Sequence, residues 1–177
     1  MPNWCSNVLR AIGSKGEIDR LLEKAQGHGV AWPEGPADEC ARRKLLLDLN
    51  RFVPMPSEIV TAGYVNADTW CQQNWGTRTN VYPGTKRERI CDYEVQFLFD
   101  TAWSPPRAVV VAMADQFPSL ILELGYSELG MGFAGTLICV NGVVVLDEWY
   151  PYSIEDVPTV VTDDPGVEAR LENVEDL

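Results

Sequence analysis

The clearest pattern in the chain is an alternation of apolar and polar positions between residues 91 and 100. The odd-numbered positions from Tyr93 to Phe99 are apolar, whereas the even-numbered ones are polar apart from Leu98. A period of two predicts a half-buried strand with one face on a core. Ser104 and Pro105 then predict a helix over 105–117, because serine caps helix N-termini and proline suits the first helical position.

A helical pattern follows Ser14 near the N-terminus. Ser14 and Glu17 have the spacing of a capping box, and apolar residues recur at helical spacing from Ile18 to Ala25 before Gly27 ends the helix. The preceding residues, 3–12, have strand character. We therefore expect a strand and then a helix at the start of the chain.

The remaining elements are expected on weaker local patterns. Residues 45–53 suit either a short helix or a strand, and the basic run 86–89 suits a connection. We expect a short helix over 66–75, strands over 77–82, 119–126, 133–140 and 143–146, and an irregular chain beyond Asp147. Asn141-Gly142 between the last two strands is a strong hairpin signal.

This order of elements predicts an α+β fold. Strand, helix, two strands, helix and strand form the ferredoxin-like β-α-β-β-α-β arrangement, an antiparallel sheet with helices on one face. We expect this domain to span 1–152, with an insertion or long connection of short helices over 28–76 and an additional C-terminal hairpin. The open face would display Asp92, Glu94, Gln96 and Asp100.

Charge is concentrated at the C-terminus. The net charge is −12, and eight acids against one base after residue 152 carry −7 of it, which leaves −5 for 1–152. We interpret 153–177 as a partly flexible, solvated acidic tail, with a short helix over 167–174 and with nucleic-acid mimicry as the alternative. A mildly acidic body disfavours nucleic acid as a partner. The chain has no membrane-length apolar run and no signal segment at its N-terminus, so we expect a cytoplasmic protein.

Cysteine and histidine usage argues against metal or redox chemistry. The five cysteines are scattered, odd in number and without a Cys-x-x-Cys pair, and His28 is the single histidine. Buried reduced thiols are the favoured interpretation. One loop histidine disfavours a histidine-based metal site or nucleophile–base pair. We therefore expect no cofactor and no metal.

Six residues at strand ends, or in loops beside them, form the candidate ligand site. They are Trp75, Arg78, Asp100, Trp103, Tyr126 and Glu128. Aromatic faces, a guanidinium and a carboxylate together suit a planar, anionic ligand, so we expect them around one concave surface. The alternatives are that the aromatic rings complete the core, that Arg78 is solvated, and that Asp100 accepts backbone N–H groups near the helix start.

Four sequence blocks resemble the YubB ferredoxin-like family of phages, plasmids and integrated mobile elements. The blocks are Met1–Asn7, Trp75-Gly-Thr-Arg78, Phe99–Pro106, and Tyr126-x-Glu128-x-Gly130-x-x-Phe133-x-Gly135. The resemblance spans residues 1–135. It implies a ferredoxin-like fold and a mobile-element setting; no common biochemical activity comes with it, and the fold name implies no iron–sulfur cluster.

Three functions from different classes remain open. The favoured one is a non-enzymatic binding protein of a phage or plasmid that acts on a host component or sequesters a small nucleotide-like ligand. Its partner would be a small anionic ligand or a host protein, and a counter-defence role would follow from genomic setting alone. The second is a metal-assisted hydrolase or nucleotidyl enzyme that uses Asp100 and Glu128. The third is a nucleic-acid-associated accessory module. No nucleophile–base set is evident, which favours the non-enzymatic function.

Overall fold

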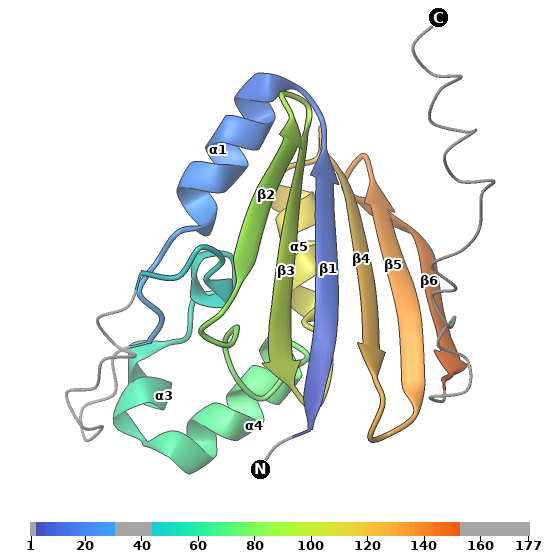
Figure 1. Cartoon of the computed structure of the whole chain (residues 1–177). Coiled ribbons are helices and arrows are strands. Elements are labelled where there is room, and N and C mark those ends of the chain that lie inside the picture. Colours follow the sequence, from blue (N-terminus) through green and yellow to red (C-terminus); the bar gives the residue numbers. More distant parts are fainter. Residues whose placement is uncertain (1–2, 31–43, 153–177) are drawn as a thin grey trace, which may run out of the picture.

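The strand β1 (Trp4–Ile12) lies at the centre of a six-stranded antiparallel sheet. The computed structural model describes residues 3–30 and 44–152. The sheet order is β2-β3-β1-β4-β5-β6 (Figure 1). The other strands are β2 (Lys86–Cys91), β3 (Glu94–Ala102), β4 (Ile121–Glu128), β5 (Phe133–Val140) and β6 (Val143–Pro151). The first four strands have the ferredoxin-like order and β5–β6 extends the sheet as a hairpin, so the expected fold class is confirmed.

The helices leave one face of the sheet open. The helical segments are α1 (Lys15–Ala25), the 3₁₀ turn η1 (Leu49–Arg51), α3 (Ser57–Thr61), α4 (Tyr64–Asn74) and α5 (Arg107–Gln116). In Figure 1 α5 lies behind the sheet, so the viewer looks onto the open face. None of the described helices is long and apolar enough to cross a membrane.

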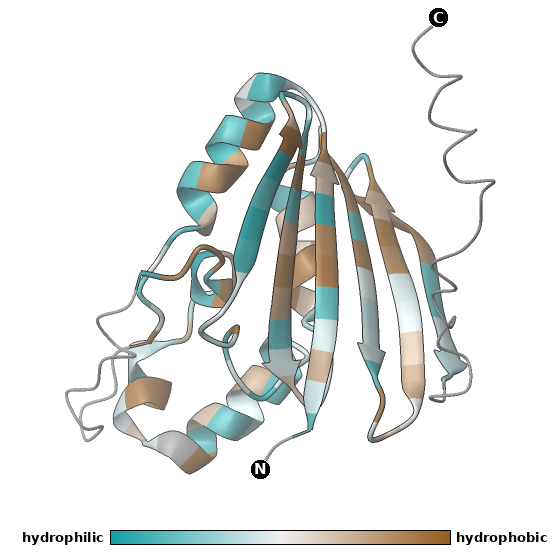
Figure 2. Cartoon of the chain, viewed as in Figure 1, coloured by the Kyte–Doolittle hydropathy of each residue, from teal (hydrophilic) through white to brown (hydrophobic). Residues whose placement is uncertain are grey.

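The core lies between the sheet and α1 and α5. Leu9, Phe97 and Leu124 come from neighbouring strands and are fully buried together with Ile18 of α1 and Val109 of α5. Burial alternates along β1 and β3, whereas Figure 2 shows apolar stretches interrupted by polar positions, because the open-face residues Val8 and Leu98 are apolar as well. Burial of each large aliphatic or aromatic side chain stabilises the fold by roughly 1.5–3 kcal/mol.

Two local sequence signals are confirmed at the atomic level. Ser14 caps α1, and its Oγ accepts a hydrogen bond from the backbone N–H of Glu17 at 3.3 Å. Asn141 and Gly142 both have positive φ angles, of 53° and 76°, in the turn between β5 and β6. Positive φ at both central residues matches the twist of antiparallel strands, which explains why Asn-Gly directs a hairpin.

The second strand is not where we expected it. Residues 77–82 contain no strand, and the basic run 86–89, expected as a connection, belongs to β2 (Lys86–Cys91), which pairs with β3. Asn80 explains the first error, because its side-chain oxygen accepts from the N–H groups of Leu49 and Val81 and so holds this segment in an irregular conformation. The second error arose because β2 is a charged edge strand without alternating burial.

Other boundaries also differ from expectation. The last strand does not end near Leu146 but continues to Pro151. The helix α5 starts at Arg107 with Pro106 as its N-cap residue, since the Ser104 hydroxyl donates instead to Gly76 O at 2.7 Å. Asp92 lies in the β2–β3 turn rather than on the open face. The 45–53 region contains only the short η1 helix, beside a bridge between Gly27 and Leu45.

The thiols follow the expectation with one exception. Cys5, Cys71 and Cys139 are buried and free, whereas Cys91 is free and exposed on the edge strand β2. Three of the expectations lie outside the described residues. They concern Cys40, the acidic tail over 153–177 and the helix expected in it over 167–174.

Candidate functional site: a groove on the open sheet face

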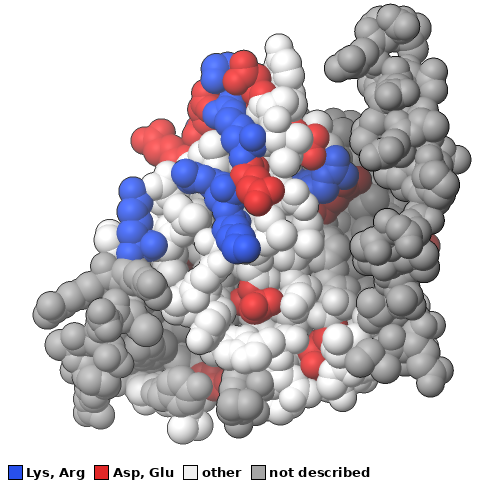
Figure 3. Space-filling view, in the orientation of Figure 1, with Lys and Arg blue, Asp and Glu red and all other residues white. Residues whose placement is uncertain are grey.

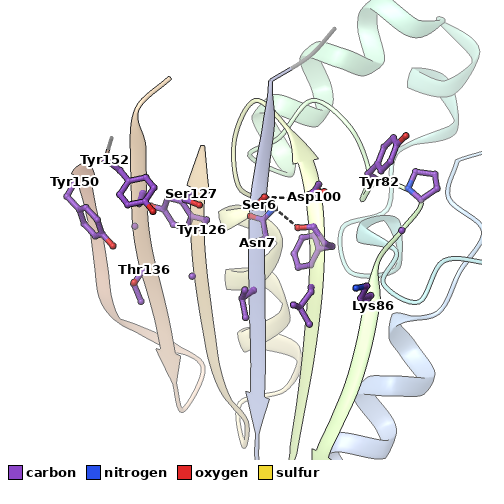
Figure 4. Close-up of a pocket in the computed structure, with 18 residues that line it drawn as sticks. Ser6, Asn7, Tyr82, Lys86, Asp100, Tyr126, Ser127, Thr136, Tyr150 and Tyr152 are labelled. Atoms are coloured by element: carbon purple, nitrogen blue, oxygen red, sulfur yellow. Dashed lines mark hydrogen bonds between the residues drawn. The ribbon is translucent and has the colours of Figure 1, made fainter. Parts of the chain in front are cut away.

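A groove of about 670 Å³ crosses the open face of the sheet (Figure 4). Strand pairing places Ser6 opposite Asp100 on one side and opposite Ser127 on the other, so these three positions share one face. The floor is hollow because most of its side chains are small. They are Ser6, Gly125, Ser127, Ala134 and Thr136.

Tyrosine side chains form the two walls of the groove. Tyr82 and the adjacent Lys86 stand on the β2 side, and Tyr150 and Tyr152 stand on the β6 side (Figure 4). The Tyr82 ring packs against Trp4 with ring centroids 4.6 Å apart. This packing holds the first wall in place, because a ring packed against another has fewer rotamers available to it.

Two charged residues, Lys86 and Asp100, are among those that line the groove. Asp100 lies on the floor, where one carboxylate oxygen accepts a hydrogen bond from Ser6 Oγ at 3.0 Å. Figure 3 shows charged atoms gathered over the upper part of the open face, while the lower part is mostly uncharged. The groove therefore offers hydroxyl groups, aromatic rings, one acid and one base to a ligand.

A buried polar network supports the floor from behind. Asn7 is 2% exposed, and its amide donates to Cys5 O, Phe99 O and Thr101 Oγ1 at 2.8, 3.3 and 3.0 Å. The Thr101 hydroxyl then donates to Ser104 O at 2.8 Å. These bonds tie β1 to β3 beneath the groove.

The N-terminus of α5 is covered by the chain itself. Gly76 has φ 83°, and a Cβ there would lie 3.2 Å from Pro105 O and 3.3 Å from Arg107 N. Such close approach is available only to glycine. The loop at Gly76 therefore covers the start of α5.

The structure divides the six expected site residues among three places. Asp100 and Tyr126 line the groove. Tyr126 is only 5% exposed, however, and its ring packs against Phe133 with centroids 6.3 Å apart. The alternative role for Asp100, accepting N–H groups near the helix start, is wrong, because its carboxylate accepts a hydrogen bond from the Ser6 hydroxyl on the open face.

Arg78 and Trp103 form a separate pair. The guanidinium carbon of Arg78 lies 5.7 Å from the centre of the Trp103 ring, and Arg78 Nε lies 4.0 Å from Asp68 Oδ1. Trp103 has φ 72°, an uncommon value for a bulky residue, and this turn directs the chain out of β3. Neither residue of the pair lines the groove.

Trp75 and Glu128 are buried. Trp75 is 1% exposed, and its indole N–H donates to Val53 O at 2.8 Å. Glu128 is 3% exposed, and its two oxygens accept from the N–H groups of Gly130 and Met131 at 2.8 and 2.5 Å. Both side chains thus hold loops in place, and the expected gathering of all six residues around one surface does not occur.

Two chemical properties of the described residues concern metal binding and the reactivity of Cys5. Among the described residues no group of three or more His, Cys, Asp or Glu side chains is placed to hold a metal ion. Burial, followed by the charges of Glu128 and Asp100, raises the pKa of the Cys5 thiol to about 12, so this thiol stays protonated at neutral pH.

Sequence analysis missed most of the groove. Small residues on the floor and the wall residues Tyr82 and Tyr150 carry no motif, and the hollow arises only from strand register. The available signal was the run of small side chains at open-face positions of β4 and β5. It becomes informative only once β4 and β1 are known to be neighbours.

Comparison with known proteins supports the fold. A search of curated proteins gives no significant match. The crystal structure of protein api92 from Yersinia pseudotuberculosis is similar with a TM-score of 0.67 and 11% identity, covering 85% of this chain and 98% of the other. At this identity the likeness concerns the fold alone. Residues 83–156, from the loop before β2 to beyond β6, match the family described as the ferredoxin-like domain in Api92-like protein.

Proposed function

We propose that this protein is a non-enzymatic binding protein and that the groove on its open sheet face holds a segment of a partner protein. The observation that carries the proposal is the groove itself, a floor of small side chains between two tyrosine walls. Tyrosine contributes large contact area and a hydrogen-bonding hydroxyl at low entropic cost, and it is enriched at protein interfaces.

The shape of the groove favours a chain segment over a small molecule. Small-molecule sites usually bury roughly 70–90% of their ligand. Here the floor is a sheet surface between walls on the β2 side and the β6 side (Figure 4), and the groove is only partly enclosed by the described residues. A polypeptide that buries one side suits this shape, and Asp100 on the floor would accept a hydrogen bond from a lysine, an arginine or a backbone N–H.

Nucleic acid fits the same surface poorly. Ferredoxin-like RNA-binding domains stack bases on aromatic side chains of the sheet. The central strands here present Ser6, Val8, Leu98 and Asp100 to the groove instead. An acid on the floor and a net charge of −12 also oppose contact with phosphates.

The positions of Asp100 and Glu128 disfavour the enzyme alternative, which required these two carboxylates to act together. Asp100 lies on the open face, whereas both oxygens of the buried Glu128 are engaged by backbone N–H groups of its own turn. A carboxylate held in this way is poorly placed to bind a metal ion or transfer a proton.

A nucleotide-like ligand remains the second candidate, supported by the contact between Arg78 and Trp103. A guanidinium beside an indole suits a planar anion. Asp68 competes with such an anion for Arg78, which is why the groove is the stronger candidate.

The setting of this activity comes from the YubB resemblance. The protein would belong to a phage or plasmid and act in the cytoplasm of the host cell, on a host protein whose exposed segment enters the groove. Binding to a host protein in this way would serve a role in countering host defence.

Site-specific photo-cross-linking tests the proposal. A photoreactive residue replaces Thr136 on the groove floor, and a matched one replaces Asp115, which is exposed on α5 at the opposite face. We expect one discrete host protein cross-linked at position 136 and absent at position 115. The proposal is contradicted if both positions give the same products, or if neither gives one and the purified protein instead binds nucleotides in a manner that Arg78→Ala abolishes.

A further inference from the structure

The outer edge of β6 is apolar and exposed. Trp149 and Tyr150 are 60% and 47% exposed, and Val143, Val144 and Val145 are exposed as well. The strand spans nine residues, and no strand pairs with its outer side within the described residues. Valine, tryptophan and tyrosine are the residues that favour strand pairing.

The other edge of the sheet is protected in a way that β6 is not. The edge strand β2 begins Lys86-Arg87-Glu88-Arg89, and Arg89 forms an ion pair with Asp19 of α1 at 2.6 Å. Charged side chains are the usual protection of an edge against another strand. On β6 the charges are confined to Asp147, which Arg107 of α5 already pairs, and Glu148.

Hydrogen bonding determines which residues of β6 point outward. The N–H of Tyr152 donates to Gly132 O at 2.8 Å, so position 152 is directed toward the β5 side. Backbone groups alternate along a strand, and positions 150 and 148 therefore also face β5. It follows that Asp147 and Trp149 direct their N–H and C=O groups to the outside, where the structure describes no strand.

We propose that β6 pairs antiparallel with β6 of a second copy, about a two-fold axis at Trp149. In this register Trp149 lies opposite its own equivalent, Tyr150 lies opposite Glu148, and Asp147 lies opposite Pro151. No carboxylate faces another carboxylate. Registers centred on Asp147 or on Glu148 would set two like charges directly opposite each other, which is destabilising.

The pairing is isologous and continues the sheet. Opposed residues share a face in an antiparallel pair, so the helices of both copies lie on one side and both open faces lie on the other. Tyr150, a wall of the groove, then lies at the junction, and two grooves stand side by side. The dimer is thus a second interaction surface, distinct from the groove floor.

The test is the association state of the full chain, measured by sedimentation velocity over micromolar to submillimolar concentrations. We expect a monomer–dimer equilibrium that Trp149→Lys weakens at least about tenfold. The matched control is Tyr93→Lys, which replaces an aromatic residue of similar exposure (63%) in the β2–β3 turn and leaves association unchanged. Hydrogen exchange at the Asp147 and Trp149 amides should be slow in the dimer and fast in Trp149→Lys.

A cysteine cross-link tests the register. Opposed residues in a hydrogen-bonded antiparallel pair have Cα atoms about 5.5 Å apart, within disulfide range. In a background of Cys40→Ser and Cys91→Ser, which removes the exposed thiol of the described residues and the one thiol outside them, Trp149→Cys should form a disulfide-linked dimer and Tyr93→Cys should not. A monomer at every concentration overturns the proposal. If the protein is a monomer and the amide hydrogens of Asp147 and Trp149 still exchange slowly, another segment of the same chain pairs with the outer edge of β6.

Discussion

The side-chain amide of Asn7 donates a hydrogen bond to Thr101 Oγ1 at 3.0 Å, across 94 residues of sequence. The Thr101 hydroxyl donates a hydrogen bond to Ser104 O, and the Ser104 hydroxyl donates one to Gly76 O. Thr77 adds a hydrogen bond to Ala102 O at 2.9 Å. Residues from three of the four sequence blocks singled out above therefore meet in one hydrogen-bonded network, so these blocks have a structural role.

Removal of the Asn7 amide should destabilise the fold. Asn7→Ala removes the side-chain donor to the buried Thr101 hydroxyl and an additional donor to the carbonyl groups of Cys5 and Phe99, and such losses cost about 1–3 kcal/mol. Urea unfolding measures the change in free energy. The control is the neighbouring Ser6→Ala on the exposed face, with an expected change within about 0.5 kcal/mol. Equal effects of the two substitutions would contradict the network's structural role.

Two residues of the Trp75–Arg78 block should behave in opposite ways. Trp75→Ala removes a buried indole and should cost about 3–5 kcal/mol of stability. Arg78 is half-exposed, and its contact with Trp103 contributes about 0.5–1 kcal/mol. Thermal unfolding of Trp75→Ala and Arg78→Ala compares them directly. A large loss of stability in Arg78→Ala would show that the Trp103 contact is part of the core.

Local signals in the sequence predicted local structure well. The capping box at Ser14 and the turn at Asn141-Gly142 work through backbone groups within a few residues, so tertiary context did not override them. The strand β2 was missed because its pairing comes from β3, not from its own charged sequence. The end of β6 was missed for a similar reason, since Trp149 pairs with Gly135 of β5.

The candidate site was harder to predict than the fold. Aromatic and charged residues at strand ends drew attention to Trp75 and Glu128, yet both are used to hold loops. The groove depends instead on residues with small side chains, such as Gly125 and Ser127, and on the order of the strands in the sheet. Neither property is visible in a single sequence without the register.

Alkaline pH should destabilise the protein through its buried thiols. Burial, followed by a nearby carboxylate, raises the pKa of Cys5 and Cys71 from 9.0 to about 12. Above pH 9 the unfolded chain loses these protons while the folded chain keeps them, so stability is fully present below pH 9 and falls as pH rises toward 12. Urea midpoints between pH 8 and pH 11 should fall less steeply in Cys71→Ala than in the wild type. Parallel slopes would contradict this assignment.

Thiol labelling should separate the described cysteines. Cys91 is exposed, whereas Cys5, Cys71 and Cys139 are buried with raised pKa values because of burial. A maleimide reagent at neutral pH should modify Cys91 rapidly and the other three only after unfolding, as peptide mass mapping would show. Rapid labelling of Cys139 in the folded protein would indicate that the β5–β6 hairpin opens.

The Glu128 side chain should matter for stability. Glu128→Gln keeps the size of the side chain but replaces one of the two acceptors for the Gly130 and Met131 amides, which should cost about 1–3 kcal/mol. Denaturant unfolding measures the loss. A fully stable variant would reopen a functional role for this carboxylate.

Filling of the groove tests the central claim most directly. A Cβ at Gly125 meets no atom within 4 Å, so the backbone position accepts a side chain, and Gly125→Trp places an indole on the groove floor. Gly16 on α1 has the same free space, and Gly16→Trp is the matched control. We predict that the partner captured at position 136 binds Gly16→Trp with wild-type affinity in calorimetry and loses measurable binding to Gly125→Trp. Equal affinity for the two variants would contradict the account.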